Sequence, residues 1–262
     1  MNRLEGKVAV ITGAGSGIGA ATADLLTAQG HRVIGVDVHD ADIVADLTTH
    51  EGRAALVEHA RDLSGGTIDA IVANAGLATE SAATVAVNFF GALATLEGLR
   101  PLLAGSSAPR AVVTASMASL FPVDDELVDA CLAHDEPAAL HRAKELIDAG
   151  QGGLIYSSTK RALVRWIRRN AATPEWAGAG IPLNGIAPGV IATAMTAQYT
   201  ETDEARKAIL EMVPMPLNGI ADASSVAHLL AYLTSAENTH LCGQVVFIDG
   251  GSDVVIRGDS TW

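Results

Sequence analysis

A tyrosine and a lysine four residues apart are the pair in this chain whose chemistry stands out. Tyr156 and Lys160 belong to the segment YSSTK, inside GGLIYSSTKRALVRWIRR. On a helix this spacing places both side chains on one face, about one turn apart. Free tyrosine has a pKa of about 10, and a neighbouring ammonium favours the phenolate. The pair predicts a proton-transfer device, with Tyr156 as acid/base and Lys160 lowering its pKa; the alternative is chance proximity.

A glycine-rich turn near the N-terminus predicts a phosphate-binding loop. The stretch VAVITGAGSGIGAA over 8–21 has the pattern of a strand, a tight turn and a helix. Glycine lets the backbone approach a ligand closely, and the N-terminus of a helix attracts a pyrophosphate. A plain strand–helix connection is the alternative when the glycines are taken alone. The residues expected at this loop are Gly13, Gly15, Ser16, Gly17, Ile18 and Gly19.

An acidic residue at the end of the second expected strand favours one form of a dinucleotide cofactor. Asp37 follows Gly19 by 18 positions, where a carboxylate binds the ribose 2′-hydroxyl and repels a 2′-phosphate. No Lys or Arg stands at 14, 16, 38 or 39 to bind such a phosphate. The sequence therefore predicts NAD rather than NADP; a solvated acid at a strand end is the alternative.

Short β-branched runs alternate with longer amphipathic stretches along the chain. This alternation predicts an α/β fold with an open parallel sheet of about seven strands, helices on both faces and one domain over 1–262. Strands are expected at 7–12, 31–37, 68–73, 109–116, 181–187 and 244–249, with one more short strand within 41–47. Helices are expected over 17–30, 53–64, 86–103, 157–176 and 223–238.

Composition excludes several classes of protein. The chain has 262 residues, of which 49% are hydrophobic, and a net charge of −13, which disfavours nucleic acid and anionic membranes as partners. Two cysteines and eight scattered histidines show no metal-ligand spacing, so we expect neither a metal nor a disulfide framework. We see no signal-peptide pattern and no apolar run of membrane-spanning length. These features predict a soluble protein in a reducing, cytoplasmic setting.

Seven short motifs, in order along the chain, resemble those of one enzyme family. The glycine turn fits T-G-x-x-x-G-x-G rather than the commoner G-x-G-x-x-G, and YSSTK fits Y-x-x-x-K. The others are ADL (45–47), ANAG (73–76), VNFFG (87–91), ASMAS (115–119) and APGVIAT (187–193). Ala73 replaces an asparagine, and Ala115 and Ser119 depart from S-S-x-x-G. Together the motifs resemble the classical short-chain dehydrogenase/reductase family over nearly the whole chain.

The resemblance implies a Rossmann-like, doubly wound fold and roles for individual residues. It implies that Ser116 donates a hydrogen bond to the substrate oxygen and that Asn88 holds a water linking Lys160 to solvent. Ser119 is an alternative donor, Asn88 an alternative buried structural residue, and Thr193 an alternative helix N-cap. The further cofactor contacts implied are Asp46 and Leu47 at the adenine; Asn74, Ala75 and Gly76; Tyr156 and Lys160; and Pro188, Gly189, Ile191 and Thr193 at the nicotinamide.

The chain departs from the family by a long stretch between Ser116 and Tyr156. Residues 120–152 predict a helical insertion of two amphipathic helices, split around Pro137, which either roofs the substrate or alters subunit association. The insertion resembles that of the bacterial 3α-hydroxysteroid dehydrogenase/carbonyl reductase branch of the family. A substrate lid is expected at about 190–216. Its apolar residues line a pocket or only pack within the lid: Met195, Tyr199, Met212 and Met215.

The resemblance implies an NAD-dependent oxidoreductase that interconverts a secondary alcohol and a ketone on a bulky apolar substrate. A hydroxysteroid, an aryl ketone or an amino-alcohol would suit it, and the acids of the insertion either face solvent or meet a cationic substrate. A homo-oligomer, dimer or tetramer, is also implied. The rivals are an NAD-dependent epimerase or dehydratase, which shares Y-x-x-x-K, and a non-catalytic NAD-binding protein.

Overall fold

Seven parallel strands form one central sheet in the computed structural model, which describes residues 6–260. The strand order is β3-β2-β1-β4-β5-β6-β9, so the expected α/β fold with about seven parallel strands is confirmed. Residues 1–5 and 261–262, which the single-domain expectation includes, lie outside the described part of the chain. The strands are β1 (Val8–Thr12), β2 (Arg32–Asp37), β3 (Ile43–Val44), β4 (Ala70–Ala73), β5 (Arg110–Thr114), β6 (Leu183–Pro188) and β9 (Val245–Ile248).

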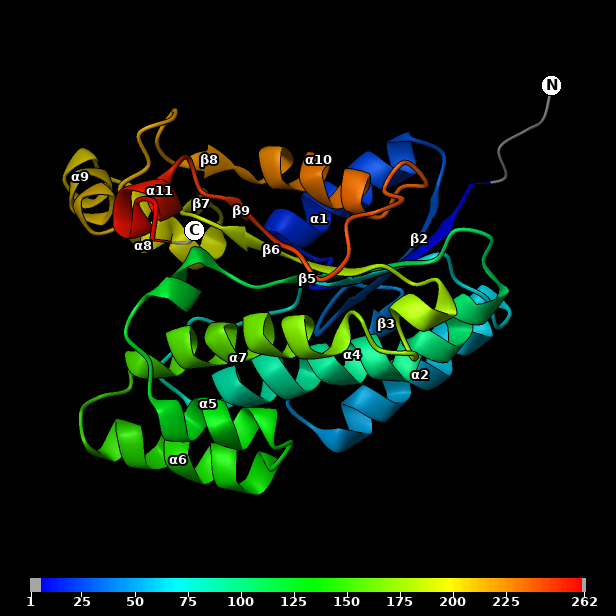
Figure 1. The fold of residues 1–262 in the computed structure, drawn as a ribbon, viewed down its shortest axis with the longest axis horizontal. Helices are drawn as coiled ribbons and strands as arrows, with labels where there is room; N and C mark the ends of the chain where they lie inside the picture. Colours follow the sequence, from blue (N-terminus) through cyan, green and yellow to red (C-terminus); the bar gives the residue numbers. More distant parts are fainter. Residues whose placement is uncertain (1–5, 261–262) are drawn as a thin grey trace.

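Helices cover both faces of this sheet (Figure 1). Helices α1 and α10 lie on one face, and α2, α4 and α7 lie on the other. Parallel strands covered on both faces need apolar side chains on both, and β4 and β5 are buried at every position. The helices are α1 (Gly17–Ala28), α2 (His50–Ser64), α3 (Ala82–Val85), α4 (Ala92–Leu99), α5 (Asp125–Leu132), α6 (Glu136–Asp148), α7 (Leu154–Asn170), α8 (Ala197–Thr200), α9 (Asp203–Met212), α10 (Ala223–Leu233) and α11 (Ser252–Arg257).

The helix expected over 86–103 is part of a longer composite helix. It joins α3, the π-helical turn η1 (Ala86–Gly91), α4 and the 3-10 turn η2 (Arg100–Gly105). By length and composition the stretch Ala82–Gly105 is apolar enough to cross a membrane, which contradicts the expectation that no such run exists. Glycines and threonines interrupt the run, but its alanines, valines, leucines and phenylalanines keep the mean hydropathy at 1.4. In the structure 72% of the apolar window is buried, so the helix forms part of the core.

The stretch between Ser116 and Tyr156 folds as two helices, as expected. After the 3-10 turn η3 (Met117–Leu120), α5 and α6 lie below α7 in Figure 1. Asp124 caps α5 and Asp135 caps α6, each by accepting a backbone N–H three residues on. Pro137 stands in the first turn of α6, where its missing N–H needs no partner. Leu127 and Leu146 are buried within the main core, so the insertion is part of the domain.

The expected lid region forms a second small unit above the carboxyl ends of the strands. It contains β7 (Ile191–Ala192), the 3-10 turn η5 (Ala194–Thr196), α8 and α9. Strand β7 pairs in parallel with β8 (Ala221–Asp222), which the sequence did not reveal. Alternation predicts strands of ordinary length, whereas each of these has only two residues.

The strand order places a crevice between β1 and β4. Strand order runs outward from β1 to β3 on one side and from β4 to β9 on the other. In open α/β sheets, ligands bind at such a switch point, beside the carboxyl ends of the strands. Both the glycine turn after β1 and the ANAG segment after β4 lie there.

Candidate active site

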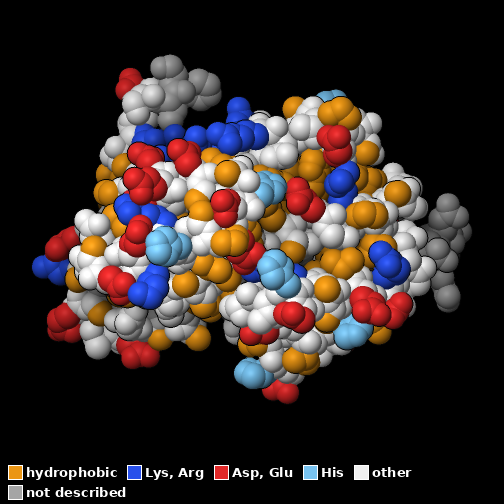
Figure 2. Space-filling view, turned by 90° about the horizontal axis from the view of Figure 1, so that it is seen from below, with side chains coloured by type: hydrophobic (Ala, Val, Ile, Leu, Met, Phe, Trp, Pro, Cys, Tyr) orange, Lys and Arg blue, Asp and Glu red, His pale blue; other side chains and the backbone are white. Residues whose placement is uncertain are grey.

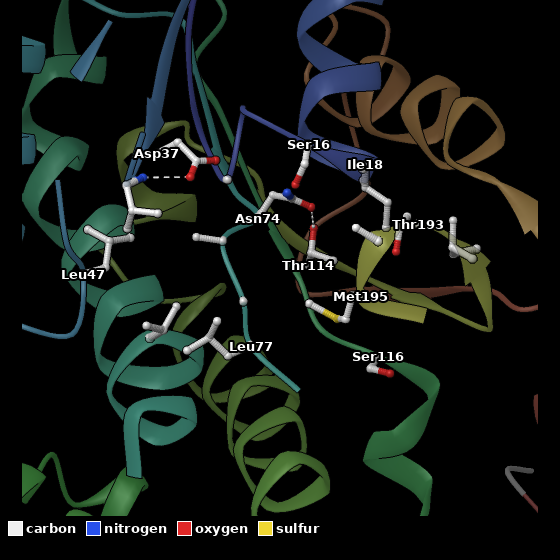
Figure 3. Close-up of a pocket in the computed structure, with 18 of the residues that line it drawn as sticks. Ser16, Ile18, Asp37, Leu47, Asn74, Leu77, Thr114, Ser116, Thr193 and Met195 are labelled. Carbon is white, nitrogen blue, oxygen red and sulfur yellow. Dashed lines mark hydrogen bonds between the residues drawn. The ribbon is translucent and has the colours of Figure 1, made fainter. Parts of the chain in front are cut away.

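A cavity of about 790 Å³ lies at this switch point and gathers most of the predicted site. In Figure 3 Asp37 and Leu47 lie toward one end, and Ser116 and Met195 toward the other. A cavity of this size falls within the range of small-molecule and cofactor sites. The predicted residues that line it are Gly13, Ser16, Gly17, Ile18, Asp37, Asp46, Leu47, Asn74, Ala75, Gly76, Ser116, Tyr156, Lys160, Pro188, Gly189, Ile191 and Thr193.

The glycine turn fits a pyrophosphate by its backbone. Gly13 has a positive φ of 71°, and a Cβ on Gly19 would lie 1.9 Å from the Gly13 carbonyl oxygen. Gly19 therefore lets α1 pack close to the turn, and it does not line the cavity. Ser16 is the N-cap of α1 but makes no side-chain capping bond, and the first turn carries no acid. The amide groups at this helix end remain available to an anion.

Asp37 lies at the carboxyl end of β2 with both carboxylate oxygens held. Oδ2 accepts the Gly15 N–H at 2.8 Å, and Oδ1 accepts the Val38 N–H at 2.7 Å. Gly15 thus supports the site through Asp37 without lining the cavity. One accepting direction on each oxygen is left over, which suits ribose hydroxyl groups. The glycine turn and Asp37 together therefore fit the dinucleotide that the sequence predicted.

Two threonines that were not among the predicted site residues fix the ANAG segment, although Thr12 belongs to the glycine motif. The Thr12 hydroxyl accepts the N–H groups of Asn74 and Ala75, at 3.0 and 3.1 Å. Thr114 donates to the Asn74 side-chain oxygen at 3.0 Å, as the dashed line in Figure 3 shows. Each threonine is the last residue of a buried strand, β1 or β5. This position at a strand end is the sequence signal that could have identified them.

Asn88 is fully buried in the π-helical turn and does not line the cavity. Its side-chain oxygen accepts the Leu77 N–H at 2.7 Å, and its amide donates to the Leu77 carbonyl at 2.9 Å. A Cβ on Gly76 would lie 3.3 Å from Asn88 Oδ1 and 3.6 Å from Lys160 Nζ, so Asn88 and Lys160 are close neighbours. The geometry favours the structural alternative for Asn88, and its role in a water relay stays a prediction.

Tyr156 and Lys160 share one face of α7, as their spacing predicts. Lys160 Nζ lies 5.7 Å from the centre of the Tyr156 ring and donates to the Thr114 carbonyl at 2.8 Å. Burial lowers the pKa of Lys160 to about 8, because desolvation penalises the charged form. Burial also raises the pKa of Tyr156, and the Ser116 hydroxyl opposes this rise. Without a cofactor, burial therefore outweighs the effect of the neighbouring ammonium, and the lowering of the Tyr156 pKa by Lys160 stays a prediction.

Ser116, not Ser119, faces the cavity. The Ser116 hydroxyl oxygen accepts the Ala118 N–H at 3.1 Å as the N-cap of η3, which leaves its own O–H free to donate. Ser119 is 2% exposed and lies outside the cavity lining described here. Its carbonyl accepts a hydrogen bond from the Arg161 guanidinium. The structure thus favours Ser116 as the hydrogen-bond donor.

Thr193 is the N-cap of η5, and it also lines the cavity, so its contact with the nicotinamide stays a prediction. Of the four apolar lid residues, only Met195 lines the cavity. Met215 is buried beneath Gly189, and its sulfur accepts the Val190 N–H at 3.3 Å. Tyr199 and Met212 are exposed on the lid surface. Helical spacing alone did not distinguish these positions.

The adenine-side residues and the insertion acids have structural partners. Asp46 Oδ1 accepts the backbone N–H and the hydroxyl of Thr48, and these bonds lower the Asp46 pKa.

In the insertion, two hydrogen bonds from Arg142 lower the pKa of Asp124. None of the described residues in 120–152 lines the cavity. The insertion acids therefore lie outside the lining of this cavity.

Several lining residues were not predicted from the sequence. Most are small or apolar residues that flank a predicted motif residue, and they contribute by backbone or shape. They are Val36, Val38, His39, Ala45, Thr48, Leu77, Val87, Thr114, Ala115, Ala194 and Thr196. Within residues 6–260 there is no group of three or more metal-ligating side chains, and Cys131 and Cys242 are both free thiols.

Comparison with known proteins identifies the class. A family model described as short chain dehydrogenase matches residues 7–45 and 40–128, and one described as enoyl-(acyl carrier protein) reductase matches 142–253. The unmatched residues between them fall inside the insertion. A curated relative, described below, shares 34% identity over 95% of this chain. The chain belongs to the short-chain dehydrogenase/reductase family, which consists of oxidoreductases that use a nicotinamide cofactor.

Three similar proteins differ in how much of their sequence and fold they share with this chain. The 3-alpha-hydroxysteroid dehydrogenase/carbonyl reductase of Comamonas testosteroni is 34% identical over 254 residues, covering 95% of this chain and 98% of that protein. The 3-alpha-hydroxysteroid dehydrogenase of Pseudomonas sp. B-0831, solved with NADH, is 38% identical with a TM-score of 0.88, covering 96% and 99% of the two chains. A Beutenbergia cavernae protein solved with NADP at low occupancy is 27% identical with a TM-score of 0.74, covering 95% and 97%.

Proposed function

We propose that this protein is an NAD(H)-dependent oxidoreductase that interconverts a secondary alcohol and a ketone on a bulky apolar substrate. The observation that carries the proposal is that Tyr156, Ser116 and Lys160 line the same cavity as the glycine turn and Asp37. Hydroxysteroids, aryl ketones and amino-alcohols are the substrate types considered. Apolar lining residues such as Leu77 and Met195, together with the relatives named above, favour the first two.

A bound nicotinamide would supply the hydride during reduction, or accept it during oxidation, at the carbon that bears the oxygen. Tyr156 takes the alcohol proton during oxidation and returns it during reduction. Ser116 donates its free O–H to the same oxygen, where negative charge develops. Lys160, fixed by the Thr114 carbonyl, presents its remaining N–H groups toward a ribose hydroxyl. Because burial raises the pKa of Tyr156, its action as a base needs added positive charge beside the phenol, which an oxidised nicotinamide carries.

Asp37 supports NAD rather than NADP as the cofactor. Its carboxylate lines the cavity, and Lys160 is the only Lys or Arg among the described lining residues. A 2′-phosphate at Asp37 would meet a fixed negative charge without a cation to offset it. Cytoplasmic location and a homo-oligomeric state, dimer or tetramer, belong to the same proposal, which follows the common pattern of the family. The lid at 190–216 and the insertion at 120–152, as parts of one domain, also belong to this proposal.

An activity screen tests this function. The purified protein is assayed by absorbance of the reduced nicotinamide with NAD and NADP across hydroxysteroids, aryl alcohols, sugars and amino-alcohols. We expect turnover with NAD and apolar secondary alcohols, and a rate at least about a hundredfold lower for Tyr156→Phe at similar NAD affinity. NAD binding without turnover on any alcohol would favour the non-catalytic alternative. Undiminished turnover by Tyr156→Phe would refute the assignment of the base.

A further inference from the structure

A buried arginine joins the insertion to the walls of the cavity. Arg53 belongs to α2 and is 7% exposed. Its two terminal nitrogens each donate to one carboxylate oxygen of Glu136, both at 2.7 Å. Glu136 opens α6, so this bidentate pair connects helices that stand 83 residues apart in the chain. Bidentate arginine–carboxylate pairs fix geometry as well as charge.

The same guanidinium also binds two backbone carbonyls beside the cavity. Arg53 Nε donates to the Leu47 carbonyl at 2.8 Å, and Nη2 donates to the Ala86 carbonyl at 3.0 Å. The guanidinium carbon lies 5.9 Å from the centre of the Phe90 ring. The side chain is thereby fixed on several sides.

Those two carbonyls belong to adjoining walls of the cavity. Leu47 lines the cavity directly, and it lies near Asp37 in Figure 3. Ala86 begins the π-helical turn whose next residue, Val87, also lines the cavity. The walls touch, since a Cβ on Gly91 of that turn would lie 3.0 Å from Leu47 Cβ. Arg53 therefore sets the spacing of both walls at the end of the cavity marked by Asp37.

Glu136 decides where this guanidinium rests. Among the described residues it is the one carboxylate that forms an ion pair with Arg53. A buried arginine without its partner carries an uncompensated charge, which draws the side chain toward solvent. The two carbonyl bonds then weaken together with the pair. The His50 ring also lies 3.6 Å from Glu136, but its side chain is 84% exposed.

We propose that Glu136 of the insertion is a positioning residue for the cofactor and acts through Arg53 on the adenosine end of the cavity. The insertion then supports dinucleotide binding from behind the site, without touching substrate or cofactor. This inference rests on the proposed dinucleotide cofactor. It predicts an effect on binding of the adenosine half rather than on the chemical step.

Calorimetric titration with NADH and with ADP-ribose tests the role of Glu136. We expect Glu136→Gln to weaken both ligands about tenfold, because the Leu47 and Val87 walls lose their fixed spacing. Turnover at saturating NAD stays within about twofold of the unchanged protein, so the effect appears in KM and not in kcat. Glu145→Gln is the matched control, since Glu145 lies on the same helix and pairs with Arg142 at 3.0 Å on the surface.

Hydrogen exchange provides a readout that needs no cofactor. Without ligand, amides of 47–50 and 86–90 should exchange faster in Glu136→Gln than in the unchanged protein or in Glu145→Gln. Glu136→Asp retains the charge with a shorter reach, and serves as a milder variant with smaller effects of the same sign. Equal ligand affinity and equal exchange in Glu136→Gln and the unchanged protein would overturn the proposal. Equal weakening in both Gln variants would overturn it as well. Absence of dinucleotide binding by the unchanged protein contradicts the proposed function instead, and the exchange data still test the Arg53 linkage.

Discussion

Tyr156 and Lys160, the proposed catalytic pair, show how burial competes with a neighbouring charge at the scale of single residues. Lys160 is 3% exposed, and its ammonium is bound to the Thr114 carbonyl. Desolvation therefore lowers the lysine pKa and raises the tyrosine pKa, so both groups tend toward their neutral forms. Ser116 is the one protein group that draws the Tyr156 pKa down. The chemistry of this site depends on which charges a bound ligand adds.

The lowered pKa of Lys160 predicts a pH-dependent stability. Folding lowers this pKa from 10.5 to about 8, so between these values the unfolded chain binds more protons. The cost of burying the Lys160 ammonium lowers the free energy of unfolding. This cost is fully present below pH 8 and disappears as pH rises toward 10.5. Relative to Lys160→Met, the free energy of unfolding of the unchanged protein should rise by about 3 kcal/mol from about pH 7 to about pH 10. Urea titrations of both proteins across this range measure the two free energies of unfolding. A difference between them that does not change with pH would contradict the burial argument.

At the scale of elements, α7 does more than carry the catalytic pair. Its side chains hold the segment 119–124, which leads from η3 into α5. Arg161 binds the Ser119 carbonyl, Ser157 donates to the Pro122 carbonyl at 2.6 Å, and Ser158 accepts the Asp124 N–H at 2.9 Å. Ser116 thus keeps its place although its motif is degenerate, because the helix that carries Tyr156 also fixes the turn after Ser116.

Arg161 is expected to affect the chemical step through Ser116. In Arg161→Met the η3 turn loses its anchor, and kcat should fall about tenfold, because small displacements of a hydrogen-bond donor reduce rates strongly. The KM for the cofactor should stay near its original value. Arg165→Met is the control, since Arg165 lies one turn further along α7 and makes only a long pair with Asp129 at 3.5 Å. Steady-state kinetics measure kcat for both variants. An equal kcat in the two would show that η3 holds Ser116 without Arg161.

The insertion belongs to one cooperative core at the scale of the whole molecule. Leu127 of α5 is fully buried in the same hydrophobic cluster as Trp166 and Trp176. On the face shown in Figure 2, acidic and basic side chains are interspersed, with a run of basic side chains along one edge. This face lacks the broad basic surface that polyanion binding needs, in keeping with the net charge of −13.

Truncation of Leu127 should destabilise the entire domain. We expect Leu127→Ala to lower the free energy of unfolding by about 2–5 kcal/mol, since it leaves a cavity in the shared core. Tryptophan fluorescence, to which Trp166 and Trp176 outside the insertion contribute, should shift together with circular dichroism in denaturant titrations. Ile147→Ala, at a position 37% exposed on α6, should change little. Unchanged tryptophan signals in Leu127→Ala would indicate that the insertion unfolds by itself.

Local patterns in the sequence determined most of the fold and the positions of the cofactor residues. β-Branched runs specify buried parallel strands, and the strand order places Gly13, Asp37 and Asn74 at one switch point. The two-residue strands β7 and β8 escaped prediction, because they are too short to show a period. Motif residues fall where the chain turns from strand to helix, and turns have strong local sequence requirements.

Only the tertiary structure decided which partners those residues contact and how deeply they are buried. Lys160 donates to the Thr114 carbonyl, Asn88 accepts the Leu77 N–H, and Arg161 donates to the Ser119 carbonyl, and these contacts form only when the chain is folded. Burial set the direction of both catalytic pKa shifts, and burial is a property of the packed molecule. The insertion likewise had two open roles in the sequence, and its contact with the cavity walls through Arg53 depends on a pairing that no local pattern encodes.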